Sequence, residues 1–191
     1  LNPEHPPLVK MMAGAPLLLL DLNFPTDSLS WIDEVNGQWD VGSKFLYDYG
    51  NDADKIIQYS RIGPMVLMLL LTFFVYVWSR ELIGPRWALL PTLFTALTPN
   101  FLAHGHYVTT DIGAALGSFV AIYYYVKYLN HQNKKHLIWA GLAFGVAMLV
   151  KFSTVLLVPL FLVIIFTYWL VEIFRTKGQI QKGKFLHFIG L

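Results

Sequence analysis

Residues 62–79, IGPMVLMLLLTFFVYVWS, decide the fold class of this 191-residue chain. The stretch carries no charged side chain, and its length approaches the roughly 20 apolar residues that a helix needs to cross a bilayer. The whole chain is 55% hydrophobic and only 14% charged, with the apolar residues concentrated in blocks. The sequence therefore predicts an all-α integral membrane protein, a polytopic helical bundle with spanning helices at about 62–79, 87–103, 111–129, 137–152 and 154–174.

The segments on either side of these spans predict the rest of the organisation. Residues 4–20 begin polar and end in four leucines, a pattern that favours an interfacial helix. Residues 21–60 hold eight acidic residues against two lysines, and their aromatics suit headgroup depth. We therefore expect residues 1–60 to form an external loop with short juxtamembrane helices, one or two of them in 41–60. For residues 175–191 the sequence predicts a cytoplasmic basic segment and the start of a further helix. Because the chain begins at Leu1 rather than Met, we expect a fragment of a larger protein.

The distribution of cations predicts the orientation in the membrane. Positive charge accumulates in cytoplasmic joints of polytopic proteins. If the five predicted helices cross the membrane in alternating directions, nine cations fall on one side: Arg80, Arg86, Lys127, Lys134, Lys135, Arg175, Lys177, Lys182 and Lys184. That side is predicted to be cytoplasmic, so residues 1–60, the joint 104–111 and Lys151 are predicted to face the periplasm, exterior or lumen.

The outer side collects the ionisable groups that could carry chemistry, and such groups at a membrane edge suggest a functional site. A carboxylate there can accept a proton from an acceptor hydroxyl. Fixed cations can stabilise charge on a departing lipid phosphate, most strongly where water is scarce. The candidates are Glu4 and Asp111 as catalytic acids or bases, and His5, Lys10, Arg61, His104, His106 and Lys151 as ligands of a carrier phosphate.

Several of these residues have a purely structural alternative. Asp111 follows two threonines at a predicted helix start, so it could be an N-cap or a partner of the helix dipole. Lys151 could extend to the interface and complement a helix C-terminus. Arg61 could anchor the chain at the headgroups. His104 and His106 could bind a divalent metal with Asp111, or could make only interfacial hydrogen bonds. No cofactor is indicated with certainty.

Other classes of function find no support. The chain has no cysteine, which excludes disulfides and thiolate metal sites, and its net charge of +2 gives no sign of nucleic-acid binding. It lacks a Walker motif and a Gly-x-Gly-x-x-Gly loop. The pair His131 and His136 has no matching acid, which excludes a zincin.

Four stretches carry a resemblance to a known family: NPEHPPLVK (2–10), FLYDYGNDADKIIQYSRIGPM (45–65), LTPNFLAHGHYVTTDIGAALG (97–117) and GLAFGVAMLVKFST (141–154). Together they resemble bacterial and archaeal members of glycosyltransferase family 39, which are related to protein O-mannosyltransferases and to aminoarabinose transferases of lipid A. The resemblance implies a GT-C fold with an active site facing away from the cytoplasm. It also implies inverting transfer of a sugar from a dolichyl- or polyprenyl-phosphate carrier to a protein, lipid or glycan. The expected location is a bacterial or archaeal plasma membrane.

The resemblance also implies roles for individual residues. Arg61, Asp111 and Lys151 match an arginine, an acid and a lysine of the family, and His5 stands where aminoarabinose transferases have a phosphate-binding lysine. The principal catalytic aspartate belongs to an Asp–Glu pair upstream of residue 1, so we expect the fragment alone to be inactive. Glu4 and Asp111 would then position the acceptor or assist that base.

Two rival functions remain open. A transporter or flippase could use Asp111 and Lys151 as a coupling pair, although transporters usually place such charges near the bilayer midplane. A noncatalytic membrane subunit is the other alternative.

Overall fold

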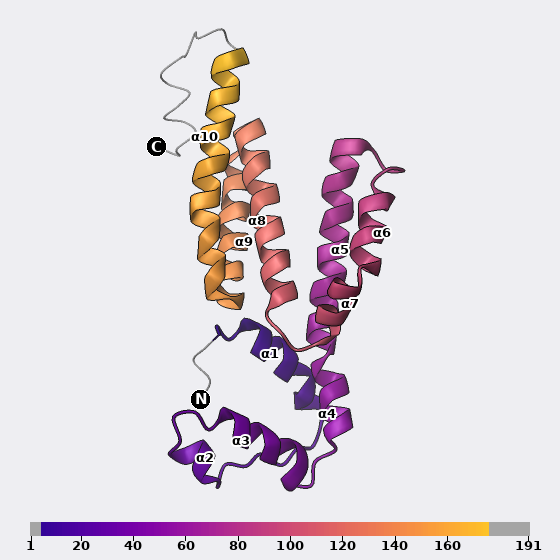
Figure 1. The fold of residues 1–191 in the computed structure, drawn as a ribbon, viewed down its shortest axis with the longest axis vertical. Coiled ribbons are helices and arrows are strands. Elements are labelled where there is room, and N and C mark those ends of the chain that lie inside the picture. The colour runs from indigo at the N-terminus through magenta and orange to yellow at the C-terminus, as the bar shows by residue number, and fades with distance from the viewer. Residues whose placement is uncertain (1–4, 176–191) are drawn as a thin grey trace.

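The computed structural model describes residues 5–175, and all regular structure in that range is helical. Figure 1 shows α8, α9 and α10 grouped on one side, α5, α6 and α7 on the other, and the first four helices gathered at one end. In chain order the elements are α1 (Leu8–Gly14), the 3-10 turn η1 (Ala15–Leu19), α2 (Leu29–Ile32), α3 (Gln38–Ser43), the π-helical turn η2 (Lys44–Asp48), α4 (Ala53–Ser60), α5 (Ile62–Ile83), α6 (Leu89–Leu97), α7 (Pro99–His106), α8 (Asp111–His131), α9 (Lys134–Val150), the 3-10 turn η3 (Phe152–Leu156) and α10 (Leu157–Arg175).

Three continuous helical stretches in the described range are long and apolar enough to cross a membrane: Ala53–Ile83, Asp111–His131 and Phe152–Phe174. Helix α9, with 17 residues, lies between the last two of these stretches in chain order. The basic segment and further helix expected over 175–191 fall almost wholly outside the described residues.

The region 87–103 differs from the single spanning helix that the sequence predicts. Two short helices, α6 and α7, form there, because Thr98 between them has an extended backbone (φ −63°, ψ 124°). Thr98 precedes Pro99, and a residue before proline is pushed out of the helical region. The break lets α7 turn toward α8 and carry the joint 107–110 across the end of the bundle.

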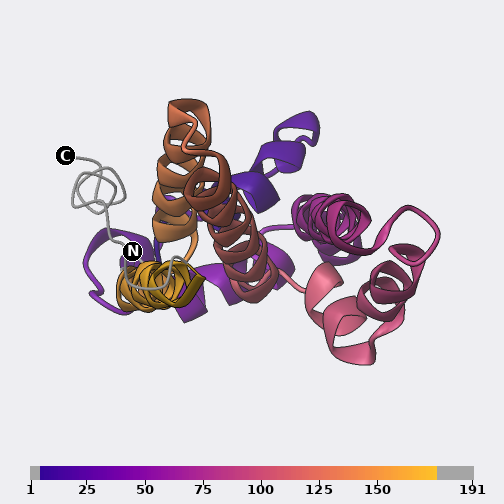
Figure 2. The ribbon, with the colours of Figure 1, turned by 90° about the horizontal axis from the view of Figure 1, so that it is seen from above.

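Helices α8 and α9 pack closely because small residues face each other. A Cβ built on Gly117 would lie 2.7 Å from the Cβ of Ala147, and both Ala121 and Ala147 are fully buried. Such small-residue contacts let membrane helices approach without a hydrophobic driving force. Leu157 at the start of α10 completes this cluster. Seen from above, α8, α9 and α10 lie side by side (Figure 2).

Helix α1 lies across the end of the bundle where α8 begins. Val9 is 2% exposed and packs with Leu67 of α5, Ile112 of α8 and Val150 of α9. Gly63 at the start of α5 is close enough to α1 that a Cβ there would lie 2.8 Å from the Met12 carbonyl oxygen. The described part of the interfacial segment expected over 4–20 is therefore a short helix and a 3-10 turn, and the helix packs against α5, α8 and α9.

The loop between η1 and α5 is held together by polar side chains. The Asn51 side chain donates to the carbonyls of Asn23 and Phe45, both at 2.7 Å, and accepts from the Asn23 N–H at 2.9 Å. The Tyr49 hydroxyl donates to the Asp27 carboxylate at 2.6 Å. This hydrogen bond lowers the pKa of Asp27 and raises that of Tyr49. The loop thus has its own fold at the same end as α1.

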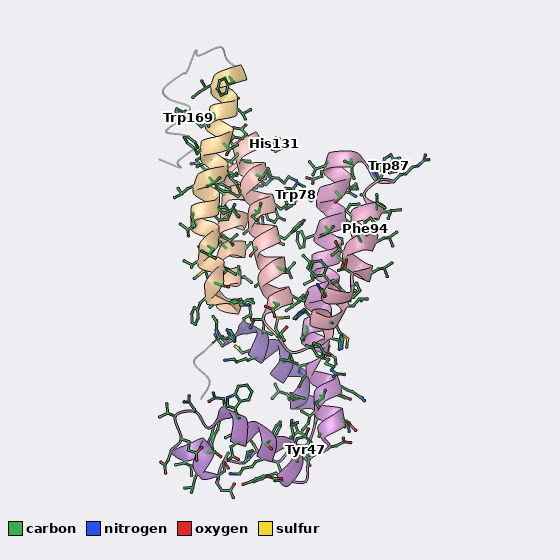
Figure 3. All side chains as sticks on the ribbon, in the orientation of Figure 1. Tyr47, Trp78, Trp87, Phe94, His131 and Trp169 are labelled. Carbon is green, nitrogen blue, oxygen red and sulfur yellow. The ribbon has the colours of Figure 1, made fainter. Side chains whose placement is uncertain are left out.

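The opposite ends of α5 and α8 are joined by a second polar cluster. Glu81 accepts from the Tyr123 hydroxyl at 2.8 Å and from Lys127 Nζ at 2.9 Å. Trp78 lies between the two helices (Figure 3), with its ring 5.6 Å from that of Tyr123. Aromatic and charged groups together are typical of a membrane–water interface.

Candidate functional site

The site is built around an ion pair between the ends of two antiparallel helices. Lys151 Nζ lies 2.8 Å from Asp111 Oδ1, although 40 residues separate them. Asp111 is the first residue of α8, and Lys151 follows the last residue of α9. Because α8 and α9 are joined by a tight turn at Gln132, the start of one and the end of the other meet at the same end of the bundle.

The local backbone explains how Lys151 reaches this position. Lys151 is extended (φ −152°, ψ 130°) and ends α9, and its N–H still donates to the Ala147 carbonyl. Thr154 closes the following turn, with its hydroxyl donating to the Lys151 carbonyl at 2.7 Å. Asp111 does not act as the N-cap of α8, because Thr110 holds that position. The N-cap alternative for Asp111 therefore does not apply, whereas both residues do have a favourable position relative to the helix dipoles.

His104 approaches the other oxygen of the same carboxylate. Its Nδ1 lies 3.5 Å from Asp111 Oδ2, so α7 also contributes to the site. The side chains are partly open to solvent, with 45% of Asp111 and 30% of Lys151 exposed. A surface pair of this kind stabilises a fold by only about 0.2–1 kcal/mol, so its structural contribution is small.

His106 turns away from the carboxylate. Its Nδ1 bonds to the Leu102 carbonyl at 2.7 Å, and its ring lies 4.5 Å from that of Tyr107. Among residues 5–175 there is no group of three or more His, Cys, Asp and Glu side chains placed to hold a metal ion. The His104–His106–Asp111 arrangement considered as a metal site therefore does not assemble in this geometry.

A small groove of about 300 Å³ opens beside the Lys151 side chain, between α8, η3 and α10. Three hydroxyl-bearing residues line it with Lys151: Ser118, Ser153 and Thr154. The rest of its wall is apolar and includes Leu157 and Leu160. The groove therefore offers a cation and hydroxyls next to hydrocarbon, an arrangement suited to a phosphate with an apolar tail. Sequence reasoning did not select these hydroxyls, although two of them directly follow Lys151 and Phe152.

The remaining candidates lie on neighbouring elements. Lys10 Nζ donates to the His5 carbonyl at 3.0 Å, at the start of α1. Arg61 is half-buried at the junction of α4 and α5. Val9 connects α1 to the site, because a Cβ on Gly113 of α8 would lie 3.3 Å from Val9. Glu4 lies outside the described residues, so the structure gives no position for it.

Comparison with known proteins identifies a similarity to a protein family. A family model described as dolichyl-phosphate-mannose-protein mannosyltransferase matches residues 54–189, which include α5 to α10, all of α4 but its first residue, and the Asp111–Lys151 pair. No curated protein matches the chain. No solved structure matches it either.

Proposed function

Because the chain belongs to the dolichyl-phosphate-mannose-protein mannosyltransferase family, we propose that it forms part of the active site that moves a sugar from a polyprenyl-phosphate carrier to an acceptor hydroxyl. Members of this family are membrane glycosyltransferases, in agreement with the three spanning helical stretches in residues 5–175. The observation that carries the residue assignment is the Lys151–Asp111 pair at 2.8 Å, with Lys151 lining a groove that also contains hydroxyl-bearing and apolar side chains.

We assign Lys151 to the carrier phosphate. In the transfer, the acceptor oxygen forms a bond to the anomeric carbon, and the bond between that carbon and the phosphate oxygen breaks. Direct displacement inverts the anomeric centre, and the electron pair of the broken bond remains on the polyprenyl phosphate. Negative charge therefore grows on the phosphate in the transition state, where a fixed ammonium group stabilises it. Arg61 is the second candidate for this task.

We assign Asp111 a positioning role. It holds Lys151 Nζ at 2.8 Å, and Lys151 is also part of the lining of the groove that contains the hydroxyl-bearing residues. The acceptor proton passes to a carboxylate base, which the family resemblance assigns to the Asp–Glu pair upstream. Glu4 and His5 are proposed to approach the same phosphate or acceptor, and His104 to orient Asp111.

The transporter alternative fits the geometry less well. Coupling charges in transporters usually lie near the bilayer midplane on broken helices. Asp111 is the first residue of its helix, and Lys151 lies just beyond the end of another. A pair at helix ends faces the membrane surface, where a carrier phosphate and a water-soluble acceptor can meet.

The test is sugar transfer by the complete protein in vesicles that contain polyprenyl-phosphate-mannose, with a peptide rich in serine and threonine as acceptor. We expect Lys151→Ala to lower the turnover by about 10²–10³, as for the loss of one charge-stabilising group. Lys134→Ala, at the other end of the bundle, is the matched control and should keep normal transfer. Normal rates in both Lys151→Ala and Asp111→Ala, at equal membrane abundance, would remove this pair from the active site.

A further inference from the structure

His104 approaches a carboxylate that already holds a cation. Its Nδ1 lies 3.5 Å from Asp111 Oδ2, while Lys151 Nζ lies 2.8 Å from Oδ1 of the same group. A lysine keeps its charge near neutral pH, whereas histidine is the side chain that gains or loses its charge between about pH 5 and 8. The total charge of the three groups therefore depends on the proton of His104.

The two protonation states of His104 offer different sites to a phosphate. When the imidazole is neutral, the charges of Asp111 and Lys151 cancel, and a phosphate must compete with the carboxylate for the ammonium group. When the imidazole is protonated, two cations share the carboxylate, and the three groups carry one net positive charge. The two cations also repel each other, so the hold of Asp111 on Lys151 weakens. A phosphate is then attracted more strongly and meets a more available ammonium group.

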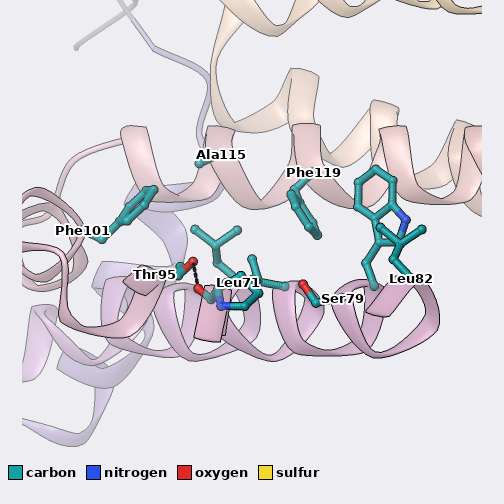
Figure 4. A pocket seen from close by; sticks show the side chains of 10 residues that line it. Leu71, Ser79, Leu82, Thr95, Phe101, Ala115 and Phe119 are labelled. Carbon is teal, nitrogen blue, oxygen red and sulfur yellow. Dashed lines mark hydrogen bonds between the residues drawn. The ribbon is translucent and has the colours of Figure 1, made fainter. Parts of the chain in front are cut away.

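Among residues 5–175, the ionic partner of His104 is Asp111. Two charged groups act on this carboxylate, Lys151 and His104. His106 is on the same helix, but its Nδ1 bonds to a backbone carbonyl of α7. Helix α7 also packs against α5 and α6. There Phe101 lines a groove of about 460 Å³ that has no ionisable side chain in its wall (Figure 4).

We propose that protonation of His104 regulates the carrier site, because it releases Lys151 from Asp111 and strengthens the binding of the donor phosphate. The inference rests on the proposed function, in which Lys151 binds that phosphate. His104 is a positioning residue, since it acts on the phosphate through the other two side chains. It is 48% exposed, so its proton exchanges with the compartment that the site faces. By linkage, the bound donor in turn favours the protonated histidine.

The test is equilibrium binding of polyprenyl-phosphate-mannose to the complete protein in phosphatidylcholine nanodiscs, without an acceptor, between about pH 5.5 and 7.5. The donor is a phosphodiester, which carries a single negative charge throughout this range, so a pH dependence reports on the protein. We expect the wild-type Kd to fall about fivefold from the high to the low end of the range, as for one added charge at a partly solvated site.

Two substitutions fix the charge at position 104. His104→Gln should keep a Kd near the high-pH wild-type value throughout the range, and His104→Arg should keep a Kd near the low-pH value. His106→Gln is the matched control, because that ring turns away from the carboxylate, and it should retain the wild-type pH dependence. Membrane abundance and thermal unfolding identify any variant that does not fold.

The pH profile separates regulation from a structural role. A structural role of His104 would change the Kd by the same factor at every pH. The proposal is overturned if His104→Gln retains the wild-type pH dependence, if the wild type shows none, or if His106→Gln abolishes it. Lys151→Ala tests the proposed function separately, because a Kd equal to that of the wild type at the high-pH end would remove Lys151 from the carrier site, whatever the profile of His104→Gln.

Discussion

At the scale of single residues, the Asp111–Lys151 pair combines a small structural value with a large proposed chemical one. Both side chains are partly solvated, so their attraction is screened and contributes at most about 1 kcal/mol to folding. The same ammonium group gains influence when a lipid phosphate covers it and water leaves, because electrostatic interactions strengthen in a drier environment. The two roles can therefore be separated by experiment.

We predict that Asp111→Asn leaves the free energy of unfolding within about 1 kcal/mol of the wild type and lowers the turnover of sugar transfer. The amide keeps the shape of the side chain but no longer holds the ammonium group. Removal of the competing negative charge should also leave the KM for the donor unchanged or lower it. A purely structural residue would change stability and turnover together. Asp111→Glu, which restores the charge, should recover part of the turnover.

The Tyr49–Asp27 hydrogen bond predicts how the juxtamembrane loop responds to pH. The lowered pKa of Asp27 means that its contribution is present above the unfolded value near 3.9 and is lost as the pH falls through the lower folded value. The raised pKa of Tyr49 means that its contribution is present below about pH 10 and is lost on further alkalisation. The protection factors for hydrogen exchange at Asn23 and Asn51, in which the exchange rate is corrected for its intrinsic pH dependence, should therefore be highest between these limits.

Tyr49→Phe is the matched change for this loop. It removes the hydroxyl that donates to Asp27 and keeps the ring. We expect lower protection factors at neutral pH, and little dependence of these protection factors on pH between about 4 and 10. Identical exchange in the two proteins would show that this hydrogen bond does not order the loop.

At the scale of elements, close helix contacts make specific demands on side-chain size. Gly117→Val should destabilise the protein by about 1–3 kcal/mol, because the added side chain meets Ala147 at distances below 3 Å. Gly145→Ala is the control, since a Cβ there has no neighbour within 4 Å and alanine favours a helix. Thermal unfolding in detergent measures the stability of both variants. If Gly117→Val were as stable as the control, α8 and α9 would not be in close contact in the membrane.

The sequence predicts the long spanning helices because a bilayer forces every backbone polar group into internal hydrogen bonds. Apolar length alone therefore identifies α5, α8 and α10. Pro99 marks residue 98 as a point where a helix can break, but apolar length alone does not predict the division between α6 and α7 that the extended backbone at Thr98 produces. The docking of α1 through Val9 also escapes sequence analysis, because it depends on the rotation of three other helices.

The candidate site, like the fold, is only partly predictable from the sequence. Charge counting and helix alternation place Asp111 and Lys151 at one end of the bundle, and the structure brings them into contact at 2.8 Å. The direction in which each side chain points from its helix depends on how the helices pack, and the positions of the residues along the sequence do not determine it. His104 and His106 are two residues apart, yet only His104 approaches Asp111. The groove hydroxyls at Ser118 and Ser153 become visible only once α8 and η3 are side by side.

At the scale of the whole molecule, one end carries the Asp111–Lys151 pair, α1 and the acidic loop, and the other carries the cations of the α5–α6 and α8–α9 joints. This division makes the orientation in the membrane testable, and the absence of cysteine from these 191 residues means that a cysteine introduced here is the only one in this part of the protein. Thr109→Cys and Ser153→Cys report on the first end, and Lys135→Cys reports on the second.

We predict that a membrane-impermeant maleimide added from outside intact cells labels Thr109→Cys and Ser153→Cys, whereas Lys135→Cys reacts only after the membrane is opened. The physical reason is the cation count, because positive joints stay on the cytoplasmic side. The opposite pattern would place Asp111 and Lys151 against the cytosol. A carrier phosphate bound there would then have to be loaded and used in the cytosolic leaflet, and the assignment of the pair to sugar transfer on the outer face would fail. Labelling of all three positions from outside would instead indicate that the membrane is leaky, which Lys135→Cys in the same preparation detects.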